Sequence, residues 1–127
     1  MGSCLPSLLQ LAGTKYFPDF TEKILPLETP EGESPNKLVP VELLRSLLAD
    51  LTNLGVCEKW RSVVLERCFG YEGEELRSFE EMIVDFCETG GEGREFPVLS
   101  RVDVGHTDPM VTVPLNALAR LDSRENF

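Results

Sequence analysis

The chain has 127 residues, of which 42% are hydrophobic and 27% are charged, and its formal net charge is −10. This composition is typical of one soluble globular domain with a core of its own. Nucleic acids and anionic membranes both attract basic surfaces, so the acidic balance disfavours these two kinds of partner. No run approaches the ~18 apolar residues of a membrane-spanning helix. We therefore expect a single domain, residues 1–127, that binds neither nucleic acid nor membrane.

The N-terminal segment is apolar up to a glycine. Residues 3–12 predict a short helix with leucines on one side, ended by Gly13. The run lacks a preceding basic residue and is a poor signal peptide, and Pro6 stands where a myristoylation pattern needs Ser or Thr. A cytoplasmic or nuclear location is the resulting expectation. A second short helix is expected over residues 18–25, with Pro26 ending it.

Residues 26–40, PLETPEGESPNKLVP, separate this region from the middle of the chain. They hold four prolines and three glutamates and few apolar residues. Such a composition is typical of an exposed loop. We expect this loop to be mobile.

The middle of the chain predicts three amphipathic helices, over residues 41–54, 56–69 and 73–88. Apolar residues recur at helical spacing in each segment, and Gly55 and Gly70 are suitable stops. Connections this short require the helices to pack as neighbours. The residues expected in the core are Leu47, Leu51, Trp60, Val64, Phe79, Ile83 and Phe86.

The first of these helices contains an LxxLL pattern, Leu44-Arg45-Ser46-Leu47-Leu48. A docking helix of this kind must expose its leucines to a groove on a partner. Here Leu51 and Leu54 extend the apolar stripe to three turns, and leaving such leucines in water costs roughly 1.5–3 kcal/mol each. The pattern is therefore interpreted as a core helix.

The cysteines, Cys4, Cys57, Cys68 and Cys87, form no CxxC pair and match no zinc spacing. Cys57 and Cys68 lie eleven residues apart, which places them on nearly the same face of a helix. Buried, reduced thiols that pack as small hydrophobic side chains are the expected arrangement.

The last third is rich in valine. Residues 96–113 predict a β-hairpin or an extended segment lying over the helices, with "GHTDP" as turn chemistry, and a short helix is expected from Pro114. The predicted fold class is therefore mainly α: a compact helical bundle of about four to five helices with a C-terminal β-hairpin or extended segment.

His106 is the only histidine, and Asp108 follows two residues later. A histidine beside a carboxylate can serve as a general base, but the sequence has no GxSxG nucleophile motif and no glycine-rich phosphate loop. His106 is therefore interpreted as a polar turn residue. No cofactor and no metal site is expected.

Acidic residues are concentrated between positions 72 and 95, where nine face only two arginines. Such a run is typical of a solvated face that keeps a protein soluble, and it also suits a protein partner with a basic patch. The residues predicted to bind that partner are Glu74, Glu75, Glu80, Glu81 and Asp85.

These observations predict a non-enzymatic protein–protein interaction domain, an adaptor or scaffold, that uses its acidic helical surface. The first alternative is a small-molecule-binding or enzymatic helical domain around His106. The second is a self-assembling helical module, so self-association is left open.

Overall fold

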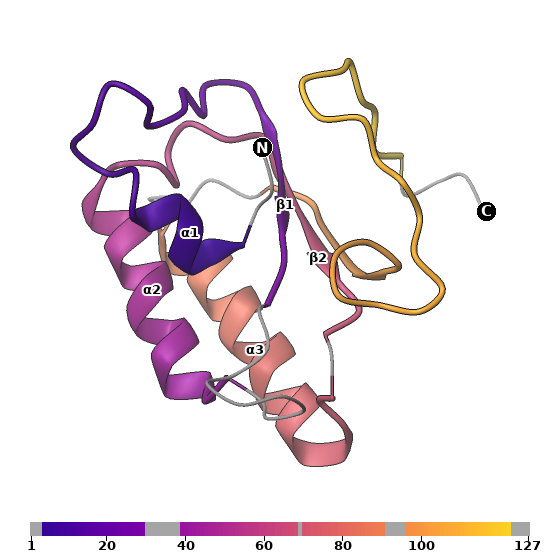
Figure 1. Ribbon diagram of the computed structural model, residues 1–127. Helices are drawn as coiled ribbons and strands as arrows, with labels where there is room; N and C mark the ends of the chain where they lie inside the picture. The colour runs from indigo at the N-terminus through magenta and orange to yellow at the C-terminus, as the bar shows by residue number, and fades with distance from the viewer. Residues whose placement is uncertain (1–3, 30–38, 69, 91–95, 123–127) are drawn as a thin grey trace.

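The computed structural model describes residues 4–29, 39–68, 70–90 and 96–122. Helices and strands alternate along the chain in the order α1, β1, α2, β2, α3, β3 (Figure 1). The helices are α1 (Leu5–Leu9), α2 (Val41–Asn53) and α3 (Gly73–Gly90), and the strands are β1 (Ile24–Leu27), β2 (Ser62–Glu66) and β3 (Val98–Val102).

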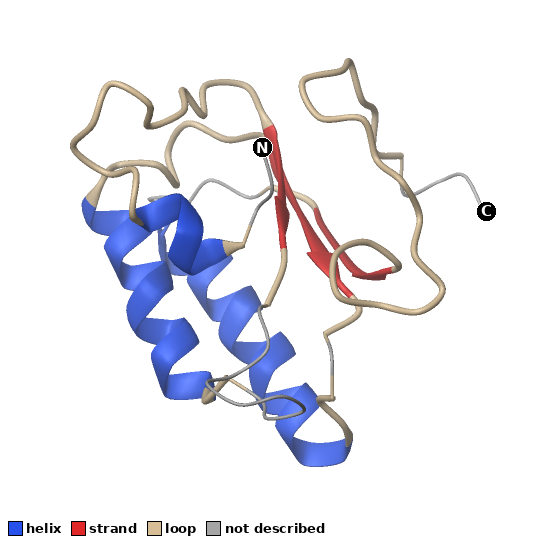
Figure 2. Cartoon of the chain, in the orientation of Figure 1, coloured by secondary structure: helices blue, strands red, loops and turns tan. Residues whose placement is uncertain are grey.

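The strands form a parallel three-stranded sheet in the order β1-β2-β3. Ile24 pairs with Ser62, and Val63 pairs with Val98. Parallel neighbours need a crossover connection, and α2 and α3 supply the two that this sheet requires. Figure 2 shows the helices together on one side of the strands. The predicted helical bundle is therefore wrong, and the fold is α/β.

The largest error concerns residues 56–69, which contain β2 instead of a helix. The strand reads SVVLE, and all of its residues except Val64 are buried. A strand covered on both faces has no polar-apolar alternation, so its short apolar run resembles a buried helix. The two β-branched valines were the signal that favoured a strand.

The expected helix at 18–25 is also wrong, because β1 begins at Ile24. Pro26 lies inside β1 and pairs with Val64. Proline, which has no N–H, is tolerated in β1 because this strand lies at the edge of the sheet. The predicted loop at 26–40 begins within β1, and residues 30–38 lie outside the described residues.

The C-terminal segment does not form a hairpin. β3 pairs in parallel with β2, and a shift between Val64 and Glu66 interrupts their register. Arg101 in β3 has a φ of 60°. Residues 103–122 contain neither helix nor strand, and they run along the side of the sheet away from the helices (Figure 1). Large apolar side chains are exposed on this segment: Met110, Val111, Val113, Leu115 and Leu118.

The core expected from the three predicted helices is largely confirmed, although one of these segments contains a strand. Leu51 and Trp60 are fully buried, and the rings of Trp60 and Phe86 meet edge to face with centroids 5.9 Å apart. Phe79 and Ile83 are also buried, whereas Leu47 and Val64 are only partly buried. Burial of Leu44 and Leu48 confirms that the LxxLL pattern belongs to a core helix.

All four cysteines are free thiols, and three of them are buried, as expected. Their placement differs from the prediction, since Cys57 lies in a turn and Cys68 follows β2. Burial raises the pKa of the Cys68 and Cys87 thiols to about 12. Across the described residues, no helix is both long and apolar enough to cross a membrane.

Candidate active site

Three titratable side chains meet at the carboxyl ends of the three parallel strands. Glu28 directly follows β1, Glu66 is the last residue of β2, and His106 lies in the loop after β3. One ligand atom from each lies within 4.8 Å of the others. In open α/β sheets, ligands bind at the carboxyl ends of the strands, so the position itself favours a functional site.

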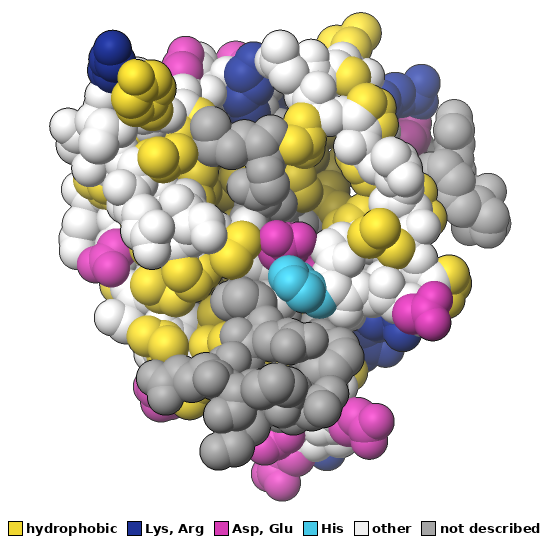
Figure 3. Space-filling view, viewed as in Figure 1, with side chains coloured by type: hydrophobic (Ala, Val, Ile, Leu, Met, Phe, Trp, Pro, Cys, Tyr) yellow, Lys and Arg dark blue, Asp and Glu magenta, His cyan; other side chains and the backbone are white. Residues whose placement is uncertain are grey.

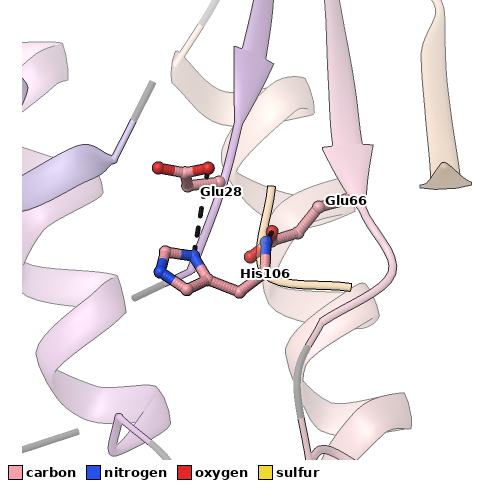
Figure 4. A group of neighbouring side chains, drawn as sticks. All are labelled: Glu28, Glu66 and His106. Atoms are coloured by element: carbon pink, nitrogen blue, oxygen red, sulfur yellow. Dashed lines mark hydrogen bonds and ion pairs between the residues drawn. The ribbon is translucent and has the colours of Figure 1, made fainter. Parts of the chain in front are cut away.

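Glu28 and His106 face each other through their side chains. Oε2 of Glu28 lies 3.9 Å from Nδ1 of His106, and the two side chains are 21% and 43% exposed. Figure 4 shows the carboxylate and the imidazole ring turned toward one another. The single histidine reaches the molecular surface beside acidic side chains (Figure 3). This arrangement leaves Nε2 as the ring nitrogen available to a reacting group.

Glu66 is buried, with only 1% of its surface exposed. Its Oε1 accepts hydrogen bonds from the backbone N–H and the hydroxyl of Thr29, the latter at 2.6 Å. Its Oε2 accepts one from the backbone N–H of His106 at 3.0 Å. Burial raises the pKa of the Glu66 carboxyl above its ordinary value of 4.5, and the charge of Glu28 acts in the same direction. These hydrogen bonds oppose that rise in pKa.

Gly105 lets both carboxylates approach this turn. A Cβ at this position would overlap Oε2 of Glu66 and would lie 2.7 Å from Oε2 of Glu28. The residue also has a φ of +77°, which side chains disfavour. Position 105 therefore requires glycine for two independent reasons.

The loop that carries His106 is tied to the end of β2 by Arg67. Arg67 Nε donates to Oδ1 of Asp103 at 2.6 Å, and Nη2 donates to the carbonyl of Asp108 at 2.9 Å. Asp108, which the sequence placed beside the histidine, thus contributes its carbonyl oxygen to Arg67. The acid that faces the imidazole is Glu28, 78 positions earlier in the chain.

A carboxylate facing Nδ1 of a histidine is the arrangement that activates a hydroxyl or thiol nucleophile. The acid holds the imidazole in one tautomer, and Nε2 then accepts the proton of the nucleophile. The 3.9 Å separation exceeds a hydrogen bond, as is common for catalytic pairs before substrate binds. Among the described residues, no serine, threonine or cysteine is hydrogen-bonded to this imidazole.

Two carboxylates and an imidazole are also possible metal ligands, and their atoms are close enough to share an ion. However, three hydrogen-bond donors already occupy the two oxygens of Glu66. A carboxylate accepts about four such bonds, so Glu66 has little capacity left for a metal. The geometry fits a proton-transfer pair better than a metal centre.

Comparison with protein families matches residues 1–121 to the LD-carboxypeptidase C-terminal domain. The chain belongs to this family. The comparison of this chain with curated proteins found no match. The prediction of a non-enzymatic adaptor or scaffold domain is therefore wrong, because the family is that of a carboxypeptidase domain.

Solved structures of the microcin C7 self-immunity protein MccF share this fold. An active-site mutant without ligand, with a serine, an asparagine and a lysine replaced by alanine, has a TM-score of 0.63 and 23% identity. A mutant bound to adenosine monophosphate gives 0.62 and 24%, and a complex with aspartyl sulfamoyl adenosine gives 0.61 and 23%. Each match covers 91% of this chain but 32% of the MccF chain. The domain thus spans about a third of the length of these structures.

The five acidic residues predicted to bind a partner lie on α3, outside the group formed by Glu28, Glu66 and His106. Glu80 is paired with Arg101 through two hydrogen bonds of 2.7 and 2.9 Å, which lower the pKa of its carboxyl. Asp85 lies 3.9 Å from Arg45. The other three, Glu74, Glu75 and Glu81, are exposed. Partner binding by these residues stays a prediction.

Sequence reasoning considered His106 but interpreted it as a polar turn residue, and it missed both glutamates of the site. A usable signal was present, because ILPLE and SVVLE are apolar runs that each end in a glutamate. The histidine follows a third valine-rich run. Read as three parallel strands, these runs would have placed their terminal residues on one edge.

Proposed function

We propose that this chain supplies the acid and the base of a peptidase active site whose nucleophile is a hydroxyl group outside the described residues. Glu28 orients His106, and His106 transfers the proton. The observation that carries the proposal is the contact between Glu28 Oε2 and His106 Nδ1 at the carboxyl edge of the sheet. Membership of the carboxypeptidase domain family supports it independently.

The proposed reaction is hydrolysis of an amide in a small peptide-like substrate. The hydroxyl oxygen attacks the carbonyl carbon while Nε2 of His106 takes its proton and then passes that proton to the leaving amine. Water hydrolyses the resulting ester in a second step that uses the same base. Glu28 keeps its charge throughout and stabilises the imidazolium.

The source of the nucleophile is supported by the MccF structures. A serine is among the active-site residues altered in one of these proteins, and this chain aligns with a third of that protein. A serine carried by the remaining two thirds of such a fold would be free to meet Nε2 of His106. Bound aspartyl sulfamoyl adenosine in a further structure supports a substrate with an acyl group on a small polar molecule.

The test is amide hydrolysis by the full-length natural protein, with peptides that end in an L,D-linked pair and with aspartyl-adenylate analogues. His106→Ala and Glu28→Gln should each lower kcat by about 10²–10⁴-fold, the usual contribution of a positioned general base. Glu22→Gln is the matched control, because Glu22 binds Arg61 at the opposite end of the sheet. Full activity in a folded His106→Ala protein would refute the proposal.

A further inference from the structure

The proposed reaction gives no role to Glu66, although this residue is the most deeply buried of the three site residues. Burial of a carboxylate is unfavourable unless its oxygens are hydrogen-bonded. Here the compensating donors belong to two segments that are distant in the sequence, one after β1 and one after β3. The placement of those donors indicates what the carboxylate does.

One oxygen of Glu66 holds the residue next to the acid of the pair. Oε1 accepts from both the backbone N–H and the hydroxyl of Thr29, which directly follows Glu28. Because Thr29 donates two hydrogen bonds to the same oxygen, its backbone is held at a fixed position beside Glu66. The path of the chain at Glu28 is therefore set from the neighbouring strand.

The second oxygen of Glu66 binds the backbone of His106, the proposed base. Oε2 accepts from the backbone N–H of His106 at 3.0 Å, while the imidazole ring is turned toward Glu28. Glu66 thus joins two loops whose contacts to it span 37 and 40 sequence positions. It reaches the backbone of His106 and leaves the ring free to react.

We propose that Glu66 is a positioning residue that fixes the distance between Glu28 and His106 by bridging Thr29 and the backbone of His106. This inference rests on the proposed function. With Glu66, the site includes a residue from β2 as well as the residues that follow β1 and β3. Glu66 does not exchange protons with the substrate. Its effect on the reaction is carried by the placement of the other two side chains.

The absence of a side chain at Gly105 supports this assignment. Both carboxylates lie against the same turn, and a Cβ there would collide with Glu66 and crowd Glu28. A bridge through Glu66 therefore needs a residue without a side chain immediately before His106. The sequence provides one.

Both oxygens of Glu66 act as acceptors, so a proton bound to either oxygen changes the hydrogen bonds that hold Thr29 and His106. The titratable groups near it are Glu28 after the end of β1, His106 in the loop after β3, and Cys68, which lies two residues after the end of β2. Burial raises the pKa of Glu66 above 4.5. The amides of Thr29 and His106 should therefore report the same protonation.

The experiment is NMR of the 127-residue chain, in which the amide signals of Thr29 and His106 are followed from about pH 8 to pH 4. Both should move with one shared midpoint above 4.5, the ordinary value of a glutamate. In Glu66→Gln that shared transition should vanish, and both amide hydrogens should exchange about 10- to 100-fold faster. Amides of α2 should be unchanged, and the control Glu22→Gln should leave all of these signals as they are.

Separate midpoints, or no movement of either amide in the unaltered chain, would overturn the bridge even if the glutamine variant failed to fold. Unchanged exchange in a folded Glu66→Gln would overturn it as well. In the full-length protein, Glu66→Gln should lower kcat about 10- to 100-fold with little change in KM.

The two proposals fail in different ways. If the amides behave as expected but His106→Ala retains full activity, the proposed function fails and the bridge stands. If activity depends on His106 but Glu66→Gln retains full kcat, the positioning role is refuted.

Discussion

Replacing Gly105 with alanine tests the packing of the site most directly. The residue has a φ of +77°, and leaving glycine in this region costs roughly 1–2 kcal/mol. The new Cβ would also overlap Oε2 of Glu66 and lie 2.7 Å from Oε2 of Glu28. Overpacking of this kind costs about 1–3 kcal/mol. Gly105→Ala should therefore lower the free energy of unfolding by about 2–5 kcal/mol.

Gly13 provides a matched control. Its φ is +76°, and no atom lies within 4 Å of the position that a Cβ would take. Gly13→Ala should therefore cost only the backbone contribution, roughly 1–2 kcal/mol. The difference between the two variants isolates the contact with the carboxylates.

The assay is urea unfolding of each variant, extrapolated linearly to water. In a Glu66→Ala background, Gly105→Ala should lose the part of its excess cost that comes from Glu66, whereas the contact with Glu28 remains. If Gly105→Ala costs no more than Gly13→Ala in the unaltered background, the two carboxylates do not pack against this turn. The geometry derived for the site would then be wrong.

Three further predictions concern the core, the thiols and the pH dependence. Leu51→Ala, at a fully buried position, should lower the free energy of unfolding by ~2–5 kcal/mol. Leu54→Ala, at a position 39% exposed, should cost distinctly less in the same urea titration. Near pH 8, a thiol reagent should rapidly modify only Cys4 in the folded chain, because burial raises the pKa of the thiols of Cys57, Cys68 and Cys87. After unfolding in denaturant, the reagent should modify all four thiols. Because the pKa of Glu66 is raised on folding, its contribution to stability is largest below 4.5 and is lost as the pH rises through the raised value. Urea titrations at several pH values should therefore show the unaltered chain gaining stability relative to Glu66→Gln as the pH falls.

The long helices could be predicted because each has one buried face. In α2, Leu44, Leu48 and Leu51 recur at helical spacing and are all buried. The predicted range 41–54 differs from the observed Val41–Asn53 by a single residue. A stripe on an otherwise polar segment has a definite period, and that period identifies the element.

The sheet could not be predicted in the same way. β2 is buried on both sides, and its two polar residues, Ser62 and Glu66, are themselves buried, so no exposed polar position marks its period. Trp60 and Val63 also fit a helical stripe. β1 contains a proline, which a local reading takes as the end of a structure. Without two of the three strands, no parallel sheet and no carboxyl edge were expected.

The candidate site was missed for the same reason. Its members are separated by dozens of residues, and only the strand order brings them together. The sequence suggested Asp108, two residues away, as the acid beside His106, whereas in the structure the carboxylate that faces the imidazole belongs to Glu28. A site of this kind becomes visible only after the strands have been assigned.

The two edges of the sheet have a consequence for how this chain behaves in concentrated solution. An exposed strand edge is a template on which another chain can add a strand, and such addition is a common start of aggregation. At one edge, β1 has only four residues, and one of them, Pro26, has no N–H to donate. Glu28, directly after β1, already forms an isolated β-bridge with Cys4. At the other, a register shift and the positive φ of Arg101 twist β3, and its arginine is charged. Both edges are therefore poor templates for the addition of a further strand.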